Sequence, residues 1–411
     1  MCGRPKNNCC GMSHNQGGAW MLTVYITTPG TKIFKEGGVL KVKKDGDTYH
    51  TIFPFRTEQV VAFGGVEISA SAMNVLLRHG IHTVFLHKNG HYNGKLVCPY
   101  DHNVLLRRMQ YKMLDDHDKC LEFCRSIARS KLRNQFVMMQ RISRFQKRNL
   151  KREILQMKEI ISKLDSAGEI ASLRGFEGAG ARVYFSVFGQ GFTEPQGFTK
   201  RVRRPPTDPV NAVLSFLYTV LFNRVAGAVE REGLDPYVGV FHAIGYGAQA
   251  LALDLMEEFR TIIVDTLVFS LFNLKIISKN DFRTLSENET EYEDILPSEQ
   301  AQIPDVIKDR MGAFSRGSED LFQEYEIADN DDTSLGDDGH GHGSVRGYPV
   351  LLTQPALKKV IEQFERKLET TFTCPFENTR ITYRKAITNQ VRRYIDFLRS
   401  ESPNYQGLVM R

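Results

Sequence analysis

The chain has 411 residues, with 41% hydrophobic and 10% aromatic residues, a composition typical of a folded protein of more than one domain. It contains no run of about 18 apolar residues and no apolar signal core near its start, which argues against a membrane-spanning or secreted protein and predicts a cytoplasmic one. Its seven cysteines are scattered from Cys2 to Cys374, a pattern that suits reduced thiols better than a disulfide framework.

The net charge of +6 is distributed unevenly along the chain. Residues 287–338 carry 17 acidic side chains against three basic ones, a local charge of −14, so the remainder of the chain carries +20. Charge separated on this scale predicts a polyanionic partner, with nucleic acid the leading candidate. A solvated surface joined to an acidic linker is the alternative.

The first hundred residues predict an extension followed by strands. Residues 1–20 are rich in Gly, Asn and Cys and lack an apolar period, which predicts a disordered extension whose cysteines match no strong zinc spacing. Residues 21–98 contain short runs of β-branched and aromatic residues separated by glycines, which predict antiparallel strands. One short helix is expected at about residues 71–78. The strand-like runs are residues 22–26, 39–42, 60–63 and 83–86.

From residue 101 to residue 164 the chain has little glycine or proline, and its apolar residues recur at helical spacing. Basic residues of nearly one sign crowd this helical stretch, which favours a surface that follows phosphates over a merely solvated face. These residues are Arg125, Arg129, Lys131, Arg133, Arg141, Arg144, Lys147, Arg148, Lys151 and Arg152.

More helices follow. Asp208 and Pro209 suit the N-cap and first position of a helix whose apolar stripe continues to Leu221 and predicts core. Further helices are expected at residues 249–272, 354–370 and 380–399. The acidic stretch at about residues 286–347 has low hydrophobicity and like charges, so most of it is expected to be disordered. The chain is therefore predicted to be an α+β protein.

Three places carry candidate chemistry. Glu177 is a single carboxylate among small residues that allow a phosphate or a backbone to approach closely, although the glycines could equally serve helix packing. His242 stands beside apolar residues, where a structural role is common. Asp254 and Glu257 share one face of an apolar helix, and a divalent cation would relieve their repulsion. Glu258 is assigned to ordinary helix surface.

Carboxylate oxygens with one imidazole suit Mg²⁺ or Mn²⁺. Beside a phosphodiester, such a cation polarises the phosphoryl oxygen and lowers the pKa of an attacking hydroxyl or water. Arg260, three residues after Glu257, could neutralise the acids or reach a phosphate.

Several ordered segments resemble the CRISPR-associated integrase-endonuclease family that acts in spacer acquisition. The resemblance runs from about Met21 to Gly407, apart from the acidic insert, and its specificity comes from the order and spacing of the segments. These are residues 131–135 (KLRNQ), residues 175–178 (GFEG) with Ala181 and Tyr184, residues 203–211 (RRPPTDPVN), Phe241 with His242, residues 253–260 (LDLMEEFR) and Gln390.

The resemblance implies a small N-terminal β-sandwich domain used for dimerisation, at residues 21–98, and a larger all-α catalytic domain at residues 101–411. Carried over by position, Glu177, His242 and Glu257 would be the catalytic metal ligands, and Asp254 would be an acid beside the metal. The candidate DNA contacts are Arg174, Tyr184, Arg203, Arg204 and Arg260.

The resemblance also implies a reaction and an assembly. The 3′-hydroxyl of a captured DNA fragment would attack a phosphodiester of a CRISPR repeat, and water in its place would give endonuclease activity. Homodimers would bind double-stranded DNA and a small ferredoxin-like partner in a heterohexamer. The alternatives are a non-catalytic nucleic-acid-binding scaffold, or a metal-dependent nuclease or mobile-element integrase outside CRISPR. The N-terminal extension and the long acidic insert depart from the family pattern, and the insert could compete with DNA for basic faces.

Overall fold

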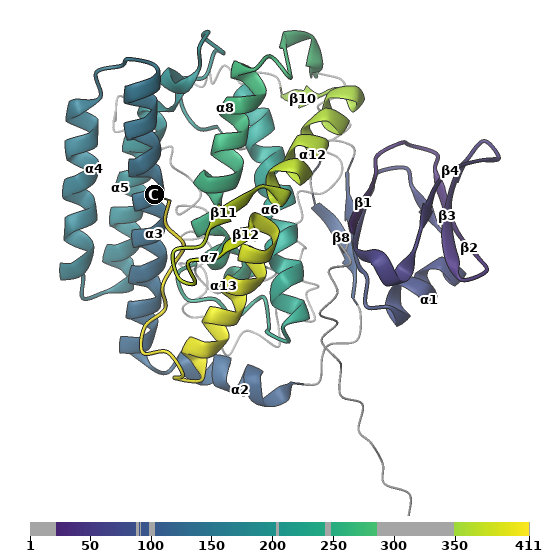
Figure 1. Ribbon diagram of the computed structural model, residues 1–411, viewed down its shortest axis with the longest axis horizontal. Coiled ribbons are helices and arrows are strands. Elements are labelled where there is room, and N and C mark those ends of the chain that lie inside the picture. Colours follow the sequence, from purple (N-terminus) through teal and green to yellow (C-terminus); the bar gives the residue numbers. More distant parts are fainter. Residues whose placement is uncertain are drawn as a thin grey trace, which may run out of the picture. The chain divides into compact units, whose positions relative to one another are not determined.

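The computed structural model describes residues 22–87, 90, 92–97, 103–202, 205–242, 248–285 and 349–410. The expectations for residues 1–20 and for the acidic insert therefore lie outside the described residues. The chain divides into two compact units (Figure 1). The first comprises Met1–Lys88 with Asn93–Pro99, and the second comprises Asn89–Tyr92 with Tyr100–Arg411.

The first unit contains two four-stranded sheets and one helix, α1 (Ala70–Arg78). Side chains from both sheets and from α1, including Ile33, Val60 and Leu76, belong to one hydrophobic core. The first sheet has the strand order β1 (Leu22–Ile26), β5 (Thr57–Phe63), β7 (His82–Leu86) and β8 (Tyr92–Leu96). The second sheet has the order β4 (Asp47–Ile52), β3 (Val39–Lys44), β2 (Lys32–Glu36) and β6 (Glu67–Ile68).

The expectation of antiparallel pairing is wrong for the first sheet, because β5 pairs in parallel with both β1 and β7. Parallel neighbours need a crossover connection. Here the chain leaves the first sheet after β1 to form β2, β3 and β4, and it leaves again after β5 to form β6 and α1. Glycine punctuation marks where such strands end but does not reveal which strand each will pair with.

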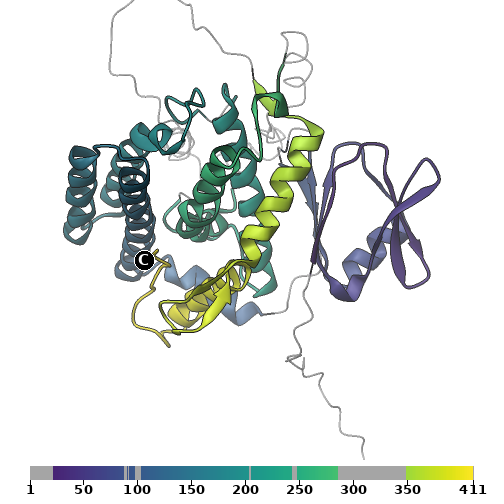
Figure 2. The same cartoon turned by 45° about the horizontal axis from the view of Figure 1, so that its top comes forward.

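The second unit is mostly helical (Figures 1 and 2). The helices among its described residues are α2 (Val104–Met113), α3 (His117–Phe145), α4 (Lys151–Lys163), α5 (Ile170–Phe188), α6 (Pro209–Arg231), α7 (Ala250–Phe259), α8 (Thr266–Asn273), α12 (Gln354–Glu369) and α13 (Tyr383–Leu398). Short 3₁₀ turns lie at Pro54–Arg56 in the first unit and at Leu164–Ser166, Gly189–Gly191 and Lys279–Asp281 in the second.

Two expectations for this unit need correction. The single helix expected at residues 249–272 is α7 and α8 joined by a π-helical segment at Arg260–Asp265. The unit is also not all-α, because it contains two short antiparallel pairs. These are β9 (Phe282–Thr284) with β10 (Val350–Leu352), and β11 (Thr371–Thr373) with β12 (Arg380–Thr382). Runs of three residues are too short for a periodic pattern to reveal them.

Helix α6 is the apolar centre of this unit. It begins as expected, with Asp208 Oδ1 accepting the N–H of Asn211 at 2.9 Å and Pro209 in the first turn. Among the described helices, α6 alone is long and apolar enough to cross a membrane, but 78% of its apolar window is buried inside the protein. A helix that is buried to this extent inside the protein is a core helix rather than a membrane span.

Helices α3, α4 and α5 lie side by side in both views, and α3 also packs against α7 (Figures 1 and 2). Helix α3 is thus the element shared by the two parts of the candidate site, because Glu177 lies on α5 while Asp254 and Glu257 lie on α7.

Candidate functional site

The position of Glu177 depends on a glycine one turn further along α5. A Cβ atom on Gly180 would overlap the buried Leu132 side chain of α3, so the two helix backbones can approach this closely only because Gly180 has none. Lys131 precedes Leu132, and its Nζ makes an ion pair with Glu177 Oε1. The small residue at position 180 therefore serves helix packing, the structural alternative that the sequence left open.

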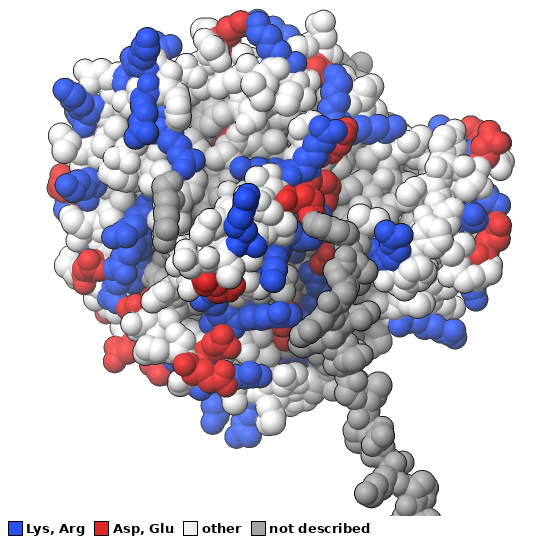
Figure 3. Space-filling view, viewed as in Figure 1, with Lys and Arg blue, Asp and Glu red and all other residues white. Residues whose placement is uncertain are grey.

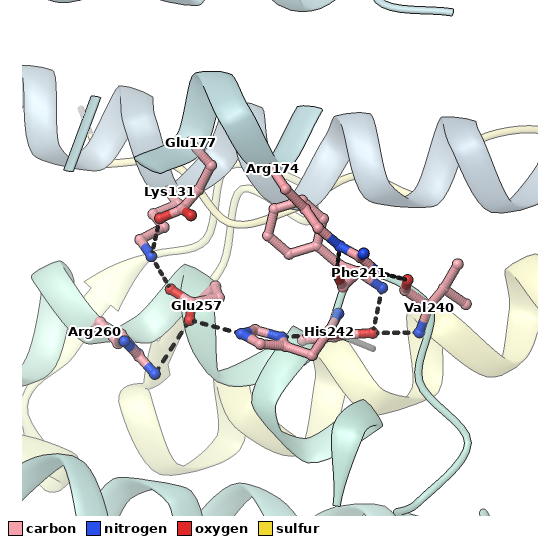
Figure 4. Close-up of polar contacts among 9 residues, drawn as sticks. Lys131, Arg174, Glu177, Val240, Phe241, His242, Glu257 and Arg260 are labelled. Carbon is pink, nitrogen blue, oxygen red and sulfur yellow. Dashed lines mark hydrogen bonds and ion pairs between the residues drawn. The ribbon is translucent and has the colours of Figure 1, made fainter. Parts of the chain in front are cut away.

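His242 is held by the loop that follows α6 (Figure 4). Arg174 of α5 donates from Nε to the carbonyl oxygen of Phe241 at 2.6 Å and from Nη2 to that of Val240 at 3.4 Å. A Cβ atom on Gly239 would overlap the backbone of Ala250, so this glycine lets the loop lie directly against the start of α7. The described part of this loop, up to His242, is thereby fixed between α5 and α7.

Asp254 anchors the same loop from the side of α7. Its Oδ2 accepts the N–H groups of Val240 at 2.7 Å and Phe241 at 3.0 Å, and its Oδ1 accepts that of His242 at 2.8 Å. The Oδ1 atom also lies 2.7 Å from His242 Nδ1. Donation from Nδ1–H to this carboxylate leaves Nε2 as the unprotonated nitrogen, the tautomer that a metal ligand requires.

Nε2 of His242 lies 3.7 Å from Glu257 Oε1, so the imidazole and this carboxylate face one another. The Glu257 side chain is only 1% exposed. Burial raises its pKa, but the charges of Arg260 and Lys131 outweigh burial and lower the pKa to about 2. Glu257 is therefore ionised at neutral pH despite its burial.

Lys131 lies between the two glutamates (Figure 4). Its Nζ is 2.7 Å from Glu257 Oε2 and also contacts Glu177. Burial lowers the pKa of Lys131, but Glu177 and Glu257 raise it by more, so the lysine stays charged. The expectation that Lys131 belongs to a phosphate-following surface is wrong for this residue, whose side chain is 9% exposed.

Arg260 contacts the opposite side of Glu257. Its Nη2 lies 3.2 Å from Glu257 Oε1, and its guanidinium lies 5.0 Å from the centre of the Tyr218 ring. Both contacts hold the arginine against the site, with 18% of its side chain exposed. Its first predicted role, neutralising the acids, agrees with this geometry.

Tyr184 is fully buried, so its prediction as a DNA contact is wrong. Its hydroxyl donates to Asp265 Oδ2 at 2.8 Å, and the Tyr218 hydroxyl donates to Asp265 Oδ1 at 2.6 Å. These bonds tie α5 and α6 to the π-helical segment that follows Glu257. Helical spacing correctly put Tyr184 on the face of Glu177, but that face packs into the core.

The assignment of Glu258 to helix surface is also wrong. This carboxylate is completely buried and accepts hydrogen bonds from Gln390 Nε2 at 2.7 Å, Leu408 N at 2.6 Å and the Tyr405 hydroxyl. Burial raises its pKa to about 7 against the lowering effect of these bonds. Asn134 Nδ2 donates to the Glu258 carbonyl at 3.0 Å and to that of Leu408 at 2.9 Å. The segment ending at residue 410 is thus fastened behind α7.

The sequence analysis did not identify Tyr405. For the burial of Glu258, the sequence contained an indication that the analysis did not use. Asn134 and Gln390 both belong to the segments that carry the family resemblance, and both contact Glu258. Their amides needed a buried polar partner, and an acid on an otherwise apolar helix is the residue type that would supply one.

The three candidate ligands come from separate segments, and Glu257 links them: it faces His242 and shares the Lys131 ammonium with Glu177. As they stand, no group of three His, Cys, Asp or Glu side chains in the described part of the chain is close enough to hold a metal ion. The cation position between the two glutamates is taken by the Lys131 ammonium instead. The donor set of two carboxylates and one imidazole nitrogen fits Mg²⁺ or Mn²⁺.

Four other basic residues of α3 form two groups. Arg125 and Arg129 make internal contacts, the first with Glu122 and the second with Asp165. Arg141 and Arg144 line a surface cavity of about 480 Å³ together with Val137, Gln140 and Phe145. Figure 3 shows Lys and Arg side chains gathered over the side of the second unit formed by α3 and α4. Arg203 and Arg204 lie outside the described residues.

Comparison of the sequence with known proteins points to one family. Residues 24–293 match the model of the family described as CRISPR associated protein Cas1. A CRISPR-associated endonuclease Cas1 of Rhodospirillum rubrum is 39% identical over 275 residues, which cover 64% of this chain and 79% of that protein. One from Chlorobaculum tepidum is 34% identical over 268 residues, covering 63% of this chain and 78% of that protein.

Solved structures share the fold. A casposase bound to an integration product has a TM-score of 0.72 at 19% identity and covers 94% of this chain and 93% of its own. A Cas1 protein from Thermotoga maritima has a TM-score of 0.70 at 17% identity and covers 95% of this chain and 100% of its own. A Cas6-RT-Cas1–Cas2 complex has a TM-score of 0.71 at 20% identity, covering 99% of this chain and 38% of its own. By the match of its sequence over residues 24–293, this chain belongs to the CRISPR-associated Cas1 family.

Proposed function

We propose that this protein is a metal-dependent DNA integrase of CRISPR adaptation, which joins the 3′-hydroxyl ends of captured DNA to a CRISPR repeat. The observation that supports this proposal is the place of Glu257 between the other two candidate ligands, which are distant in the chain. Its Oε1 faces Nε2 of His242 at 3.7 Å, and its Oε2 shares the Lys131 ammonium with Glu177. The relatives named as endonucleases and the structural neighbour captured with an integration product agree with phosphodiester chemistry.

Glu177, Glu257 and Nε2 of His242 would hold Mg²⁺ or Mn²⁺, and Asp254 would keep the imidazole in the ligating tautomer. The bound cation would polarise the phosphoryl oxygen and acidify the attacking hydroxyl. In the exchange, the attacking 3′-oxygen loses its proton and forms a bond to phosphorus, while the bond from phosphorus to the repeat's own 3′-oxygen breaks and that oxygen gains a proton. Water as the attacking group would give endonuclease cleavage.

The same proposal includes an assembly. A homodimer formed through the N-terminal β-sandwich would carry double-stranded DNA with a small ferredoxin-like Cas2 partner in a heterohexamer. Two of the structural neighbours, a Cas6-RT-Cas1–Cas2 complex and a partial one, support the Cas2 partner. Light scattering of the protein with and without the partner would measure the masses that this assembly requires.

The chemistry is tested by a strand-transfer assay with a 3′-hydroxyl DNA fragment, a repeat-containing plasmid, the small partner and Mn²⁺ or Mg²⁺. Glu177→Gln and His242→Ala should abolish the product while DNA binding survives. Glu159→Gln is the matched control, because this glutamate pairs with Lys163 on the exposed surface of α4. Equal activity in all three variants would mean that the site is misassigned.

The assay also separates the competing functions. A scaffold would bind DNA and give no product in the wild type, and a plain nuclease would cut without joining. The structural likeness to a casposase favours one further candidate, an integrase of a mobile element. Strand transfer that is equally efficient on plasmids with and without the repeat would favour that candidate over CRISPR adaptation.

A further inference from the structure

Lys131 holds a position that the proposed reaction leaves unexplained. Its ammonium is the only cation of the described residues that contacts both Glu177 and Glu257. All three side chains are largely buried, with 9%, 18% and 1% of their surfaces exposed. Neither oxygen of Glu257 accepts a hydrogen bond of regular geometry within the described part of the chain, so ion pairs alone balance its charge.

The charges around this position show what the lysine contributes. Glu177, Asp254 and Glu257 bring three negative charges, and Lys131 and Arg260 bring two positive ones when the imidazole is neutral. Removing the ammonium would leave two nearby carboxylates, one of them fully buried, with a single guanidinium contact on Glu257. An uncompensated buried charge is strongly destabilising.

The lysine and a divalent cation would use the same two carboxylates. The ammonium needs only proximity, because it is a compact charge on a flexible stem. A divalent cation needs oxygen atoms within its first coordination sphere at about 2.0–2.6 Å. Glu257 Oε2 is already paired with Nζ at 2.7 Å, so a cation that coordinated this oxygen would compete with the ammonium for it.

We propose that Lys131 is a built-in counter-ion of the metal site: it neutralises Glu177 and Glu257 in the metal-free protein and competes with the divalent cation for them. This inference rests on the proposed metal site. It follows that Lys131 stabilises the metal-free protein and weakens its affinity for metal. A lysine that merely held the ligands in place would instead strengthen metal binding.

The test uses the full chain and Mn²⁺ alone as the probe, with titration calorimetry for affinity and thermal melting in EDTA and in saturating Mn²⁺. Lys131→Met should tighten the Mn²⁺ Kd about tenfold, within the usual range of coupling between two linked equilibria. It should also melt at a lower temperature in EDTA, with Mn²⁺ restoring most of the loss. An unchanged or weaker affinity would overturn the inference.

Matched variants keep the result interpretable. Arg129→Met removes a cation of the same helix whose partner, Asp165, lies outside the site, and it should leave the Mn²⁺ Kd unchanged. Lys131→Gln also removes the charge but keeps a polar side chain, and it replaces Lys131→Met in the test if the methionine variant does not fold. It should show the same tightening, while Lys131→Arg, which keeps the charge, should not.

Glu177→Gln distinguishes failure of this inference from failure of the proposed function. If the wild type and Glu177→Gln bind Mn²⁺ alike, or if neither binds it, the proposed metal site is wrong. If Glu177→Gln loses Mn²⁺ while Lys131→Met fails to tighten it, the metal site stands and only the competition by Lys131 is wrong.

Discussion

His242 pairs with the buried Asp254, and its imidazole Nδ1 lies 2.7 Å from carboxylate Oδ1. The same carboxylate accepts three consecutive backbone N–H groups of the loop that carries the histidine. One side chain of α7 thus fixes the position of the loop, the orientation of the ring and the tautomer that faces Glu257. Asp254, which the family resemblance placed beside the metal, therefore orients the histidine.

The first prediction concerns this pair. Asp254→Asn replaces an acceptor of four contacts with an amide whose NH₂ group would face N–H donors. Strand transfer should fall by about 10- to 100-fold, the usual cost of losing an outer partner of a metal-binding histidine. The measurement is the initial rate at saturating Mn²⁺, with Asp118→Asn on the exposed first turn of α3 as control. Wild-type rates in Asp254→Asn would contradict the positioning role.

A second prediction separates two roles for Arg174, which the sequence nominated as a DNA contact and which donates to the carbonyls of Phe241 and Val240. Arg174→Met should slow strand transfer because it releases the histidine loop, while the salt dependence of DNA binding stays that of the wild type. Loss of a phosphate contact would reduce the slope of log K against log salt by about 0.9. Such a reduction would restore the original assignment.

A third prediction tests the packing of α5 on α3. Gly180→Ala would place a methyl group against the buried Leu132, and should lower the free energy of unfolding by about 1–3 kcal/mol. Gly175 lies on the same helix with open space around its Cβ position. Gly175→Ala should therefore be neutral or stabilising, by up to about 1 kcal/mol. Urea unfolding measures both, and equal effects would show that close packing at Gly180 is unimportant.

A fourth prediction follows from the burial of Tyr184. Tyr184→Phe removes one of the two tyrosine hydroxyls that donate to Asp265, and should lower the free energy of unfolding by about 1–3 kcal/mol. DNA affinity should not change, because the ring has no exposed surface. Weaker DNA binding with unchanged stability would show that Tyr184 reaches the nucleic acid after all.

A fifth prediction concerns pH and Lys367, whose ammonium lies 4.9 Å from the centre of the Tyr383 ring. Burial, and then the charge of Arg141, lower its pKa from 10.5 to about 8. At pH values between these two pKa values, Lys367 is protonated more often in the unfolded chain than in the folded protein. The free energy of unfolding should therefore rise with pH, by about 1–3 kcal/mol. Lys367→Met should remove this rise. Lys358 is an exposed lysine of α12, and the control variant Lys358→Met should keep the rise. The same slope in both variants would contradict the assignment.

The sequence by itself determined the kinds of element and several of their ends. Asp208 and Pro209 predicted the start of α6 because an N-cap acceptor and a residue without an N–H suit that position, and the structure confirms it. The expectation of strands followed by helices is confirmed as well. These features are local, since each depends on residues within one or two turns.

The family resemblance supplied what periodicity could not, namely that Glu177, His242 and Glu257 belong together. Only the tertiary structure decided the environment of each charge. Lys131 and Glu258 both occur in sequence contexts that suit a helix surface, and both are buried because their partners come from distant segments. A charged side chain can be buried only where another element supplies compensating groups. Which element does so depends on how the helices pack, and no local pattern records it.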